Sequence, residues 1–308
     1  MTDLQRKGLI YNIQHYCIHD GRGIRTAVFM KGCQLKCGWC ANPESQCRKK
    51  EIGFFGDKCT LCGACARACG KGAIDLASPR RIDTSRCDAC GDCVYACPGE
   101  ALAAFGQEKT CGELVAEAEK DRPFYRKSGG GVTITGGEPT LQGEFLLELL
   151  TALRAHGLHT AIETHGHMPD ELLQRTAPLV DQFLFDIKHM DSKKHAAGTG
   201  VPNEQIIKNM LKLALDYKAH VTMRVPLIPG FNDDNANMEN TAIFAQALKE
   251  KGSLQGVHLL PFHALATNKY AALGKEYAYR NGAPQKDERL SQILEYFRRR
   301  SVQVQIGG

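Results

Sequence analysis

Beyond residue 105 the chain alternates short apolar runs with longer segments in which apolar positions recur every three or four residues. The first pattern is typical of buried strands and the second of amphipathic helices. The expected strands are Val132–Thr135, His159–Glu163, Phe183–Ile187, His220–Pro226 and Val257–Pro261. The expected helices are Glu144–His156, Asp170–Ala177, Asn203–Tyr217 and Asn237–Lys251, with Pro and Gly at the joins.

One more apolar run, Thr26–Met30, precedes these and brings the number of expected strands to six. Strands that alternate with helices at this spacing predict βαβ units and a parallel sheet. Six units favour an α/β fold of the partial (β/α)6 TIM-like barrel type over a complete eight-fold barrel. In such sheets the active site gathers at the carboxyl ends of the strands.

Residues 51–105 differ in composition and pattern, because they are rich in Cys, Gly and Ala and show little periodicity of either kind. We therefore expect a barrel formed by residues 1–50 and 106–308, interrupted by an insert at 51–105.

Composition narrows the class of protein. The 308 residues are 43% hydrophobic and 24% charged, as in ordinary globular proteins. The net charge of +5 does not indicate nucleic acid, since Lys and Arg are spread along the chain. Neither a signal peptide nor a membrane-spanning run is apparent, so we expect a cytoplasmic protein. Fourteen cysteines in a reducing compartment suggest metal ligands rather than disulfides.

The insert contains two copies of C-x2-C-x2-C-x3-C, in CTLCGACARACGKGAI at 59–74 and CDACGDCVYACPGEAL at 87–102. Two such copies form the bacterial ferredoxin pattern, in which the fourth cysteine of each repeat binds the other repeat's 4Fe–4S cluster. That pattern assigns one cluster to Cys59, Cys62, Cys65 and Cys97, and the second to Cys87, Cys90, Cys93 and Cys69. Gly70 stands where the pattern expects proline. The alternative is a structural zinc module.

A separate loop, KGCQLKCGWC, carries Cys33, Cys37 and Cys40 directly after the first expected strand. Structural zinc would require a fourth protein ligand, and no His or Cys follows at a natural spacing. The alternative is a 4Fe–4S cluster whose fourth iron is left open for a small molecule. Cys17, Cys47 and Cys111 have no partners at ligand spacing, and we expect ordinary thiols there.

This loop, with Trp39 before its last cysteine, resembles the signature of the radical S-adenosylmethionine (SAM) superfamily. The resemblance implies that the amino and carboxylate groups of SAM chelate the open iron. Reductive cleavage of the sulfonium then gives methionine and a 5′-deoxyadenosyl radical, which abstracts a hydrogen atom. The resemblance also implies that Cys33, Cys37 and Cys40 are catalytic residues, because they would hold this cluster.

Further motifs resemble the glycyl-radical-enzyme activating enzymes of that superfamily. The GGEP turn resembles the motif that meets the methionine amino group, and IETHG and DIKHM resemble segments that contact its carboxylate and the ribose. Lys188 in the last segment is also expected to be catalytic. The implied cofactor contacts are Trp39, Asn42, Gly136, Gly137, Glu138, Pro139, Glu163, Thr164, Asp186, Lys188, Arg224 and His263.

The stretch YNIQHYCIHDGRGIRTAVFMKGC is similar to the opening of those activating enzymes. In them an Asp-Gly-x-Gly segment helps to hold the partner's glycine loop, which assigns that role to Asp20, Gly21, Arg22 and Gly23. Arg22 stands where proline is usual, so the turn lacks the fixed φ of proline.

The resemblance runs from about residue 9 to 263. It implies an anaerobic enzyme that removes a hydrogen atom from a glycine of a partner glycyl radical enzyme, such as a choline, glycerol, isethionate or hydroxyphenylacetate lyase or dehydratase. It implies three 4Fe–4S clusters and SAM, with flavodoxin or ferredoxin as electron donor, and neither a nucleic acid nor a membrane as partner. A radical enzyme acting on a small molecule is the alternative, and a plain electron-transfer protein would not need the strand-end motifs.

Overall fold

A nine-stranded sheet forms the body of the protein in the computed structural model, which describes residues 3–252 and 254–308. The strand order is β11-β10-β9-β8-β7-β6-β2-β1-β5, and every neighbouring pair from β2 to β11 is parallel. The strands are β1 (Lys7–Cys17), β2 (Arg25–Met30), β5 (Gln107–Thr110), β6 (Gly131–Gly136), β7 (Thr160–Thr164), β8 (Gln182–Asp186), β9 (Val221–Leu227), β10 (Leu254–Pro261) and β11 (Val304–Ile306).

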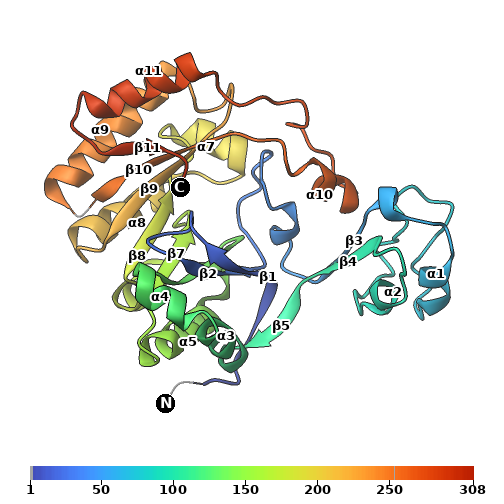
Figure 1. The fold of residues 1–308 in the computed structure, drawn as a ribbon. Helices are drawn as coiled ribbons and strands as arrows, with labels where there is room; N and C mark the ends of the chain where they lie inside the picture. The colour runs from blue at the N-terminus through green and yellow to red at the C-terminus, as the bar shows by residue number, and fades with distance from the viewer. Residues whose placement is uncertain (1–2, 253) are drawn as a thin grey trace.

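Helices cover the outer side of this curved sheet, as Figure 1 shows. They are α3 (Cys111–Glu119), α4 (Arg122–Ser128), α5 (Gly143–Ala155), α6 (Asp170–Thr176), α7 (Ser192–Thr199), α8 (Glu204–Leu215), α9 (Asn235–Lys251) and α11 (Asp287–Arg298). Helix α10 (Thr267–Ala272) lies apart from these, beside the turn at Pro43–Ser45 and the strand Glu51–Phe54. Short 3-10 turns lie at Pro43–Ser45, Gly56–Lys58, Pro139–Gln142 and Ala177–Leu179. Within the described residues no helix is long and apolar enough to span a lipid bilayer.

The six expected strands correspond to β2 and β6–β10, and the four expected helices to α5, α6, α8 and α9, with ends displaced by a few residues at most. Their identification succeeded because strands buried on both faces are continuously apolar. All of β6 except its last residue is buried, and Phe183 and Phe185 of β8 belong to the same large core as Leu146 and Leu149 of α5.

Strand β1 was not expected, and neither were β5 and β11. The exposure of β1 alternates along most of its length, with isolated polar positions such as Asn12 and Gln14. It pairs antiparallel with β2 and β5, at the margin of the sheet. Its apolar residues are therefore too scattered to resemble a buried parallel strand.

The insert stands to one side of the sheet in Figure 1 and is joined to it through a two-stranded antiparallel sheet. Strands β3 (Glu51–Phe54) and β4 (Leu102–Phe105) pair antiparallel and bring the two ends of the insert together. Between them lie two short helices, α1 (Ala64–Ala68) and α2 (Asp92–Tyr95). This closed base separates the insert from the sheet without interrupting any sheet strand.

Candidate active site

The three-cysteine loop leaves the sheet at the carboxyl end of β2, beside the carboxyl end of β6. Met30 and Gly136 are register partners at the last step of these strands. The Gly137 N–H donates to Met30 O at 2.9 Å, and the Glu138 N–H donates to Gly32 O at 2.8 Å. The backbone of the GGEP turn thus fixes the start of the cysteine loop.

Both glycines of that turn are required by close backbone contact. A Cβ on Gly136 would lie 2.3 Å from Met30 O, and Gly136 has a φ of +119°. A Cβ on Gly137 would lie 2.2 Å from Gly32 O. No side chain fits at either position without displacing the loop.

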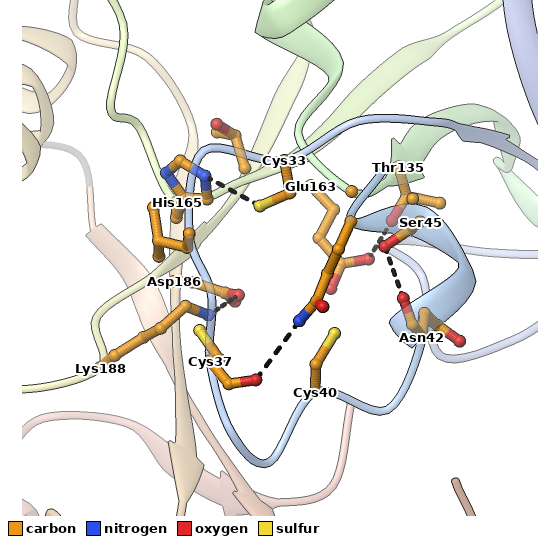
Figure 2. Close-up of a pocket in the computed structure, with 15 residues that line it drawn as sticks. Cys33, Cys37, Cys40, Asn42, Ser45, Thr135, Glu163, His165, Asp186 and Lys188 are labelled. Atoms are coloured by element: carbon orange, nitrogen blue, oxygen red, sulfur yellow. Dashed lines mark hydrogen bonds and ion pairs between the residues drawn. The ribbon is translucent and has the colours of Figure 1, made fainter. Parts of the chain in front are cut away.

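A cavity of about 150 Å³ opens between this turn and the cysteine loop, and Figure 2 shows the side chains around it. Its walls come from the cysteine loop and from the carboxyl ends of β6, β7 and β8, as expected for a parallel sheet. The lining residues are Cys33, Leu35, Cys37, Cys40, Asn42, Ser45, Gln46, Thr135, Gly136, Gly137, Glu163, Thr164, His165, Asp186 and Lys188.

The three thiols of the loop all line this cavity. Burial raises the pKa of Cys37 to about 12 and also raises the pKa values of Cys33 and Cys40. The buried Cys37 thiol and the partly buried Cys33 and Cys40 thiols would therefore stay protonated unless a metal centre compensated their charge. A donor set of three convergent thiols fits an iron–sulfur cluster with one open iron, because no fourth Cys lines the cavity and its histidine, His165, lies against Cys33 and Glu138.

Two ion pairs form the wall opposite the cysteines. Lys188 Nζ lies 2.8 Å from Asp186 Oδ2, and Arg224 Nη1 lies 3.0 Å from Glu163 Oε1. Burial disfavours the charged form of Lys188, but the Asp186 carboxylate beside it favours that form and the pKa of Lys188 is raised. Lys188 is therefore a cation at neutral pH.

Asp186 has an oxygen atom without a hydrogen-bond partner among the described residues. This atom, Oδ1, is buried. Because a buried carboxylate oxygen normally accepts a hydrogen bond, it is available to a donor on a bound molecule. With Lys188 beside it, the wall offers an anion and a cation to a zwitterionic ligand.

Glu138 of the GGEP turn does not line the cavity. Its carboxylate is fully buried and accepts hydrogen bonds from the Thr140 hydroxyl at 2.7 Å, the Thr164 hydroxyl at 2.7 Å and the His165 N–H at 3.0 Å. The side chain thus joins the end of β6 to the end of β7 and fixes Thr164 at the cavity edge.

The two cysteine repeats of the insert have the same backbone conformation. Leu61 and Ala89 have φ of 57° and 56°, and Gly63 and Gly91, which precede α1 and α2, are also left-handed. In both repeats the fourth sulfur accepts a backbone N–H at 3.3 Å, from Ala73 to Cys69 and from Ala101 to Cys97.

Thiols of one repeat have thiols of the other repeat as electrostatic neighbours. Burial raises the pKa of Cys65, and Cys97 of the other repeat raises it further. Burial raises the pKa of Cys93 to about 11, with further increases from Cys87, Cys69 and Cys90. This crossing agrees with the ligand sets that the ferredoxin pattern assigns.

Comparisons with known proteins agree with these features. The radical SAM superfamily profile matches residues 82–241, and a 4Fe–4S dicluster domain matches residues 58–101. The choline trimethylamine-lyase activating enzyme of Oleidesulfovibrio alaskensis is 41% identical over 307 residues, which is 98% of this chain and 99% of that protein. The chain belongs to the glycyl-radical-enzyme activating enzymes of the radical SAM superfamily.

Other relatives support the same assignment. The isethionate sulfite-lyase activating enzyme of Desulfovibrio desulfuricans is 41% identical, with 89% of each chain covered. Among solved structures, Streptococcus suis SuiB bound to precursor peptide SuiA matches with a TM-score of 0.51 at 14% identity, covering 89% of this chain and 46% of SuiB. At that identity the match concerns the fold alone.

The structure of this activating enzyme brings most of the predicted cofactor contacts to one cavity, but not all of them. Asn42, Gly136, Gly137, Glu163, Thr164, Asp186 and Lys188 line it. Trp39 instead packs against Phe231, with ring centroids 4.4 Å apart, in an apolar cluster behind the cysteines. His263 is exposed beyond the end of β10, and Glu138, Pro139 and Arg224 lie behind the lining residues.

The predicted partner-binding residues Asp20, Gly21, Arg22 and Gly23 lie before β2, and none of them lines the cavity. Thr133 Oγ1 donates to Asp20 O at 2.6 Å, and the Arg22 N–H donates to Gln182 Oε1 at 3.1 Å. These two contacts hold the loop against β6 and β8.

Sequence reasoning missed several lining residues, chiefly Thr135, His165, Ser45 and Gln46. Two of them carried a usable signal. Thr133 and Thr135 are polar at alternate positions of an otherwise apolar strand, which indicates one polar face on that strand. His165 lies inside the IETHG segment, directly after the end of β7.

We expect Gly137→Ala to lower the iron bound at the three-cysteine site, because the added methyl group would displace the cysteine loop from the turn. Iron and sulfide analysis of the anaerobically reconstituted protein measures this loss. Gly157→Ala is the control, since nothing lies within 4 Å of the new Cβ, even though Gly157 has a positive φ of +67° and Gly137 does not. Equal iron content in the two variants would contradict the expectation.

Proposed function

We propose that this activating enzyme holds one 4Fe–4S cluster on Cys33, Cys37 and Cys40, and SAM in the cavity beside it. The observation that supports the proposal most strongly is the convergence of three thiols on a cavity that Lys188 and Asp186 also line. When bound, the cluster and SAM supply one-electron reductive chemistry and the group that abstracts a hydrogen atom. The chain's own residues bind and orient the reactants.

The cofactor contacts follow from the walls of the cavity. The backbone at Gly136 and Gly137 would meet the methionine amino group, and Lys188 would pair with the methionine carboxylate. Glu163, Thr164 and Asp186 would accept hydrogen bonds from the remaining N–H and O–H groups of SAM. Holding the sulfonium against the cluster makes its cleavage an intramolecular event, which removes much of the entropic cost.

The remaining predicted residues would act around this centre. Glu138 and Pro139 fix the turn, Arg224 holds Glu163, and Lys188 serves catalysis by orienting the carboxylate. We place Asn42 and His263 towards the adenosyl group, and Trp39 would support the cofactor from behind the cysteines. The Lys269 ammonium bonds Asn42 Oδ1 at 2.9 Å and fixes this side chain at the rim of the cavity.

We assign the body of the chain, residues 1–50 and 106–308, to a partial (β/α)6 barrel formed by β2 and β6–β10. Strand β1 runs antiparallel to β2 and β11 adds a three-residue strand to β10, so the sheet order has two ends. An open sheet has a lateral side through which a peptide could enter, unlike a closed eight-fold barrel.

The partner is a glycyl radical enzyme, and we propose that Asp20–Gly23 receives its glycine loop. Asp20 is among the groups that raise the pKa values of Glu163 and Arg224, although burial is the largest influence on both. Asp20 of this loop therefore interacts electrostatically with Arg224, which pairs with Glu163 in the cavity wall. Glycine suits hydrogen abstraction because its α-carbon carries no side chain that would block approach.

The names of the relatives indicate the class of partner. They include activating enzymes for a choline trimethylamine-lyase, an isethionate sulfite-lyase and a (2S)-3-sulfopropanediol dehydratase. We propose a partner that cleaves a C–N, C–S or C–O bond of a small alcohol or sulfonate, in an anaerobic cytoplasm.

We assign residues 51–105 to a ferredoxin-like domain with two further 4Fe–4S clusters, three in the whole chain. One would use Cys59, Cys62, Cys65 and Cys97, and the other Cys87, Cys90, Cys93 and Cys69. Cys62 and Cys90 are exposed, so each cluster would have one ligand at the surface. We propose that these clusters relay electrons from flavodoxin or ferredoxin to the cavity.

Anaerobic incubation with SAM, reductant and a purified candidate partner tests the function. We expect a glycyl doublet in the electron paramagnetic resonance (EPR) spectrum of the partner, and no doublet from a partner variant whose loop glycine is alanine. Cleavage of SAM without a doublet, across partners of all three bond-cleaving types, would contradict the proposal.

Removing any one cysteine of the loop should abolish SAM cleavage. We expect Cys33→Ala, Cys37→Ala and Cys40→Ala each to lose roughly a third of the bound iron and all 5′-deoxyadenosine formation, because a 4Fe–4S cluster with one open iron has no spare ligand. Cys47→Ala is the control, since this thiol does not line the cavity. Retained cleavage in any of the three variants would refute the ligand assignment.

The relay role of the insert is tested by replacing Cys62 and Cys93 with alanine, one ligand of each insert cluster. We expect SAM cleavage with reduced flavodoxin as donor to fall at least tenfold while the EPR signal of the cavity cluster persists. Unchanged turnover with flavodoxin would end the relay hypothesis and leave the insert a structural or docking role.

A further inference from the structure

His165 lies between the buried Glu138 carboxylate and the first cysteine of the loop, Cys33, which its ring contacts in Figure 2. The residue follows β7 directly and is only 5% exposed. Its Nε2 atom lies 3.7 Å from Cys33 Sγ and 3.2 Å from Glu138 Oε2. Since sulfur is large, 3.7 Å is a hydrogen-bond distance for an N–H donor.

The other ring nitrogen fixes the tautomer. His165 Nδ1 accepts the backbone N–H of His167 at 3.2 Å, so Nδ1 cannot itself carry a proton. A neutral imidazole has a single N–H, which must then be on Nε2. That proton faces Cys33 and Glu138 together.

Glu138 competes with Cys33 for this proton, and both of its oxygens already accept hydrogen bonds. Its Oε1 accepts from the hydroxyls of Thr140 and Thr164, and its Oε2 already accepts the His165 backbone N–H at 3.0 Å. The Nε2–H is therefore shared with the Cys33 sulfur. Because Glu138 is anchored at four groups, it also prevents the imidazole from turning away from Cys33.

We propose that His165 is a positioning residue that donates its Nε2–H to the Cys33 thiolate and raises the reduction potential of the cluster in the cavity. The inference rests on the proposed cluster at Cys33, Cys37 and Cys40. Hydrogen bonds to cluster sulfurs stabilise the more negative, reduced state and so favour one-electron reduction. His165 would make it easier for the electron donor to reduce this cluster.

The test measures the midpoint potential of the cavity cluster in the intact, fully loaded protein by dithionite titration with EPR detection. Addition of SAM identifies the relevant signal, since only the cluster with an open iron changes its spectrum on binding SAM. His165→Leu removes the donor, whereas His165→Gln keeps an N–H near the Nε2 position. His167→Leu is the matched control, because its backbone N–H remains and its side chain does not line the cavity.

We expect His165→Leu to lower the reduced-to-oxidised ratio at fixed potential by about threefold to tenfold, where tenfold is about 59 mV for one electron. The His165→Gln and His167→Leu variants should stay close to the unaltered protein. A His165→Leu potential equal to that of the unaltered protein would overturn the inference, and so would an equal shift in His167→Leu.

If His165→Leu fails to assemble the cluster, His165→Asn replaces it, because the shorter amide reaches the Nδ1 position and not Nε2. Equal potentials for the Asn and Gln variants would overturn the inference, as would loss of the cluster in the Gln variant, which would give His165 a structural role. An unaltered protein without any SAM-sensitive signal would instead contradict the proposed function.

Discussion

The close backbone contact between the cysteine loop and the GGEP turn determines the rest of the site. Gly32, Gly136 and Gly137 approach so closely that a single Cβ on either residue of the turn would collide with a carbonyl oxygen. Gln142 reinforces this junction, since its amide donates to Lys31 O at 3.0 Å and to Leu9 O at 2.9 Å. The cysteines can converge on one cavity because the loop begins from a fixed point.

Charge balance is the second constraint on the cavity. Asp186 and Arg224 are register partners on β8 and β9, and each pairs with a charged neighbour, Lys188 and Glu163. Buried charges are costly unless they are paired, so the four groups support one another across three strand ends. Their sum is zero, which suits a ligand whose own amino and carboxylate groups are both charged.

The sequence predicted the central strands, four of the helices and most of the cavity lining, because these features depend on local pattern. Continuous apolar runs mark the strands β2 and β6–β10, and motifs at their carboxyl ends mark Gly136, Thr164, Asp186 and Lys188. Strand β1 escaped prediction because one of its faces is half exposed and interrupts the apolar run. His165 escaped because its importance depends on two contacts, to Cys33 and Glu138, that join segments more than twenty residues apart. Side-chain proximity of this kind has no periodic signature.

The insert could be added between the cysteine loop and β5 because its ends meet in the β3–β4 strand pair. It is nevertheless connected to the cysteine loop by direct contacts. Lys31, which follows β2, has a fully buried side chain whose Nζ bonds Glu51 Oε2 at 2.7 Å and Glu44 O at 2.5 Å. Glu51 is the first residue of β3, and Glu44 lies in the turn after Cys40. One ammonium therefore connects the base of the insert to the loop that carries the cavity cysteines. A buried ammonium group without either partner would lack a compensating contact, so the position of the insert and the geometry of the cysteine loop are set together. For a chain that would pass electrons from the insert to the cavity, this coupling keeps the distance between donor and acceptor constant.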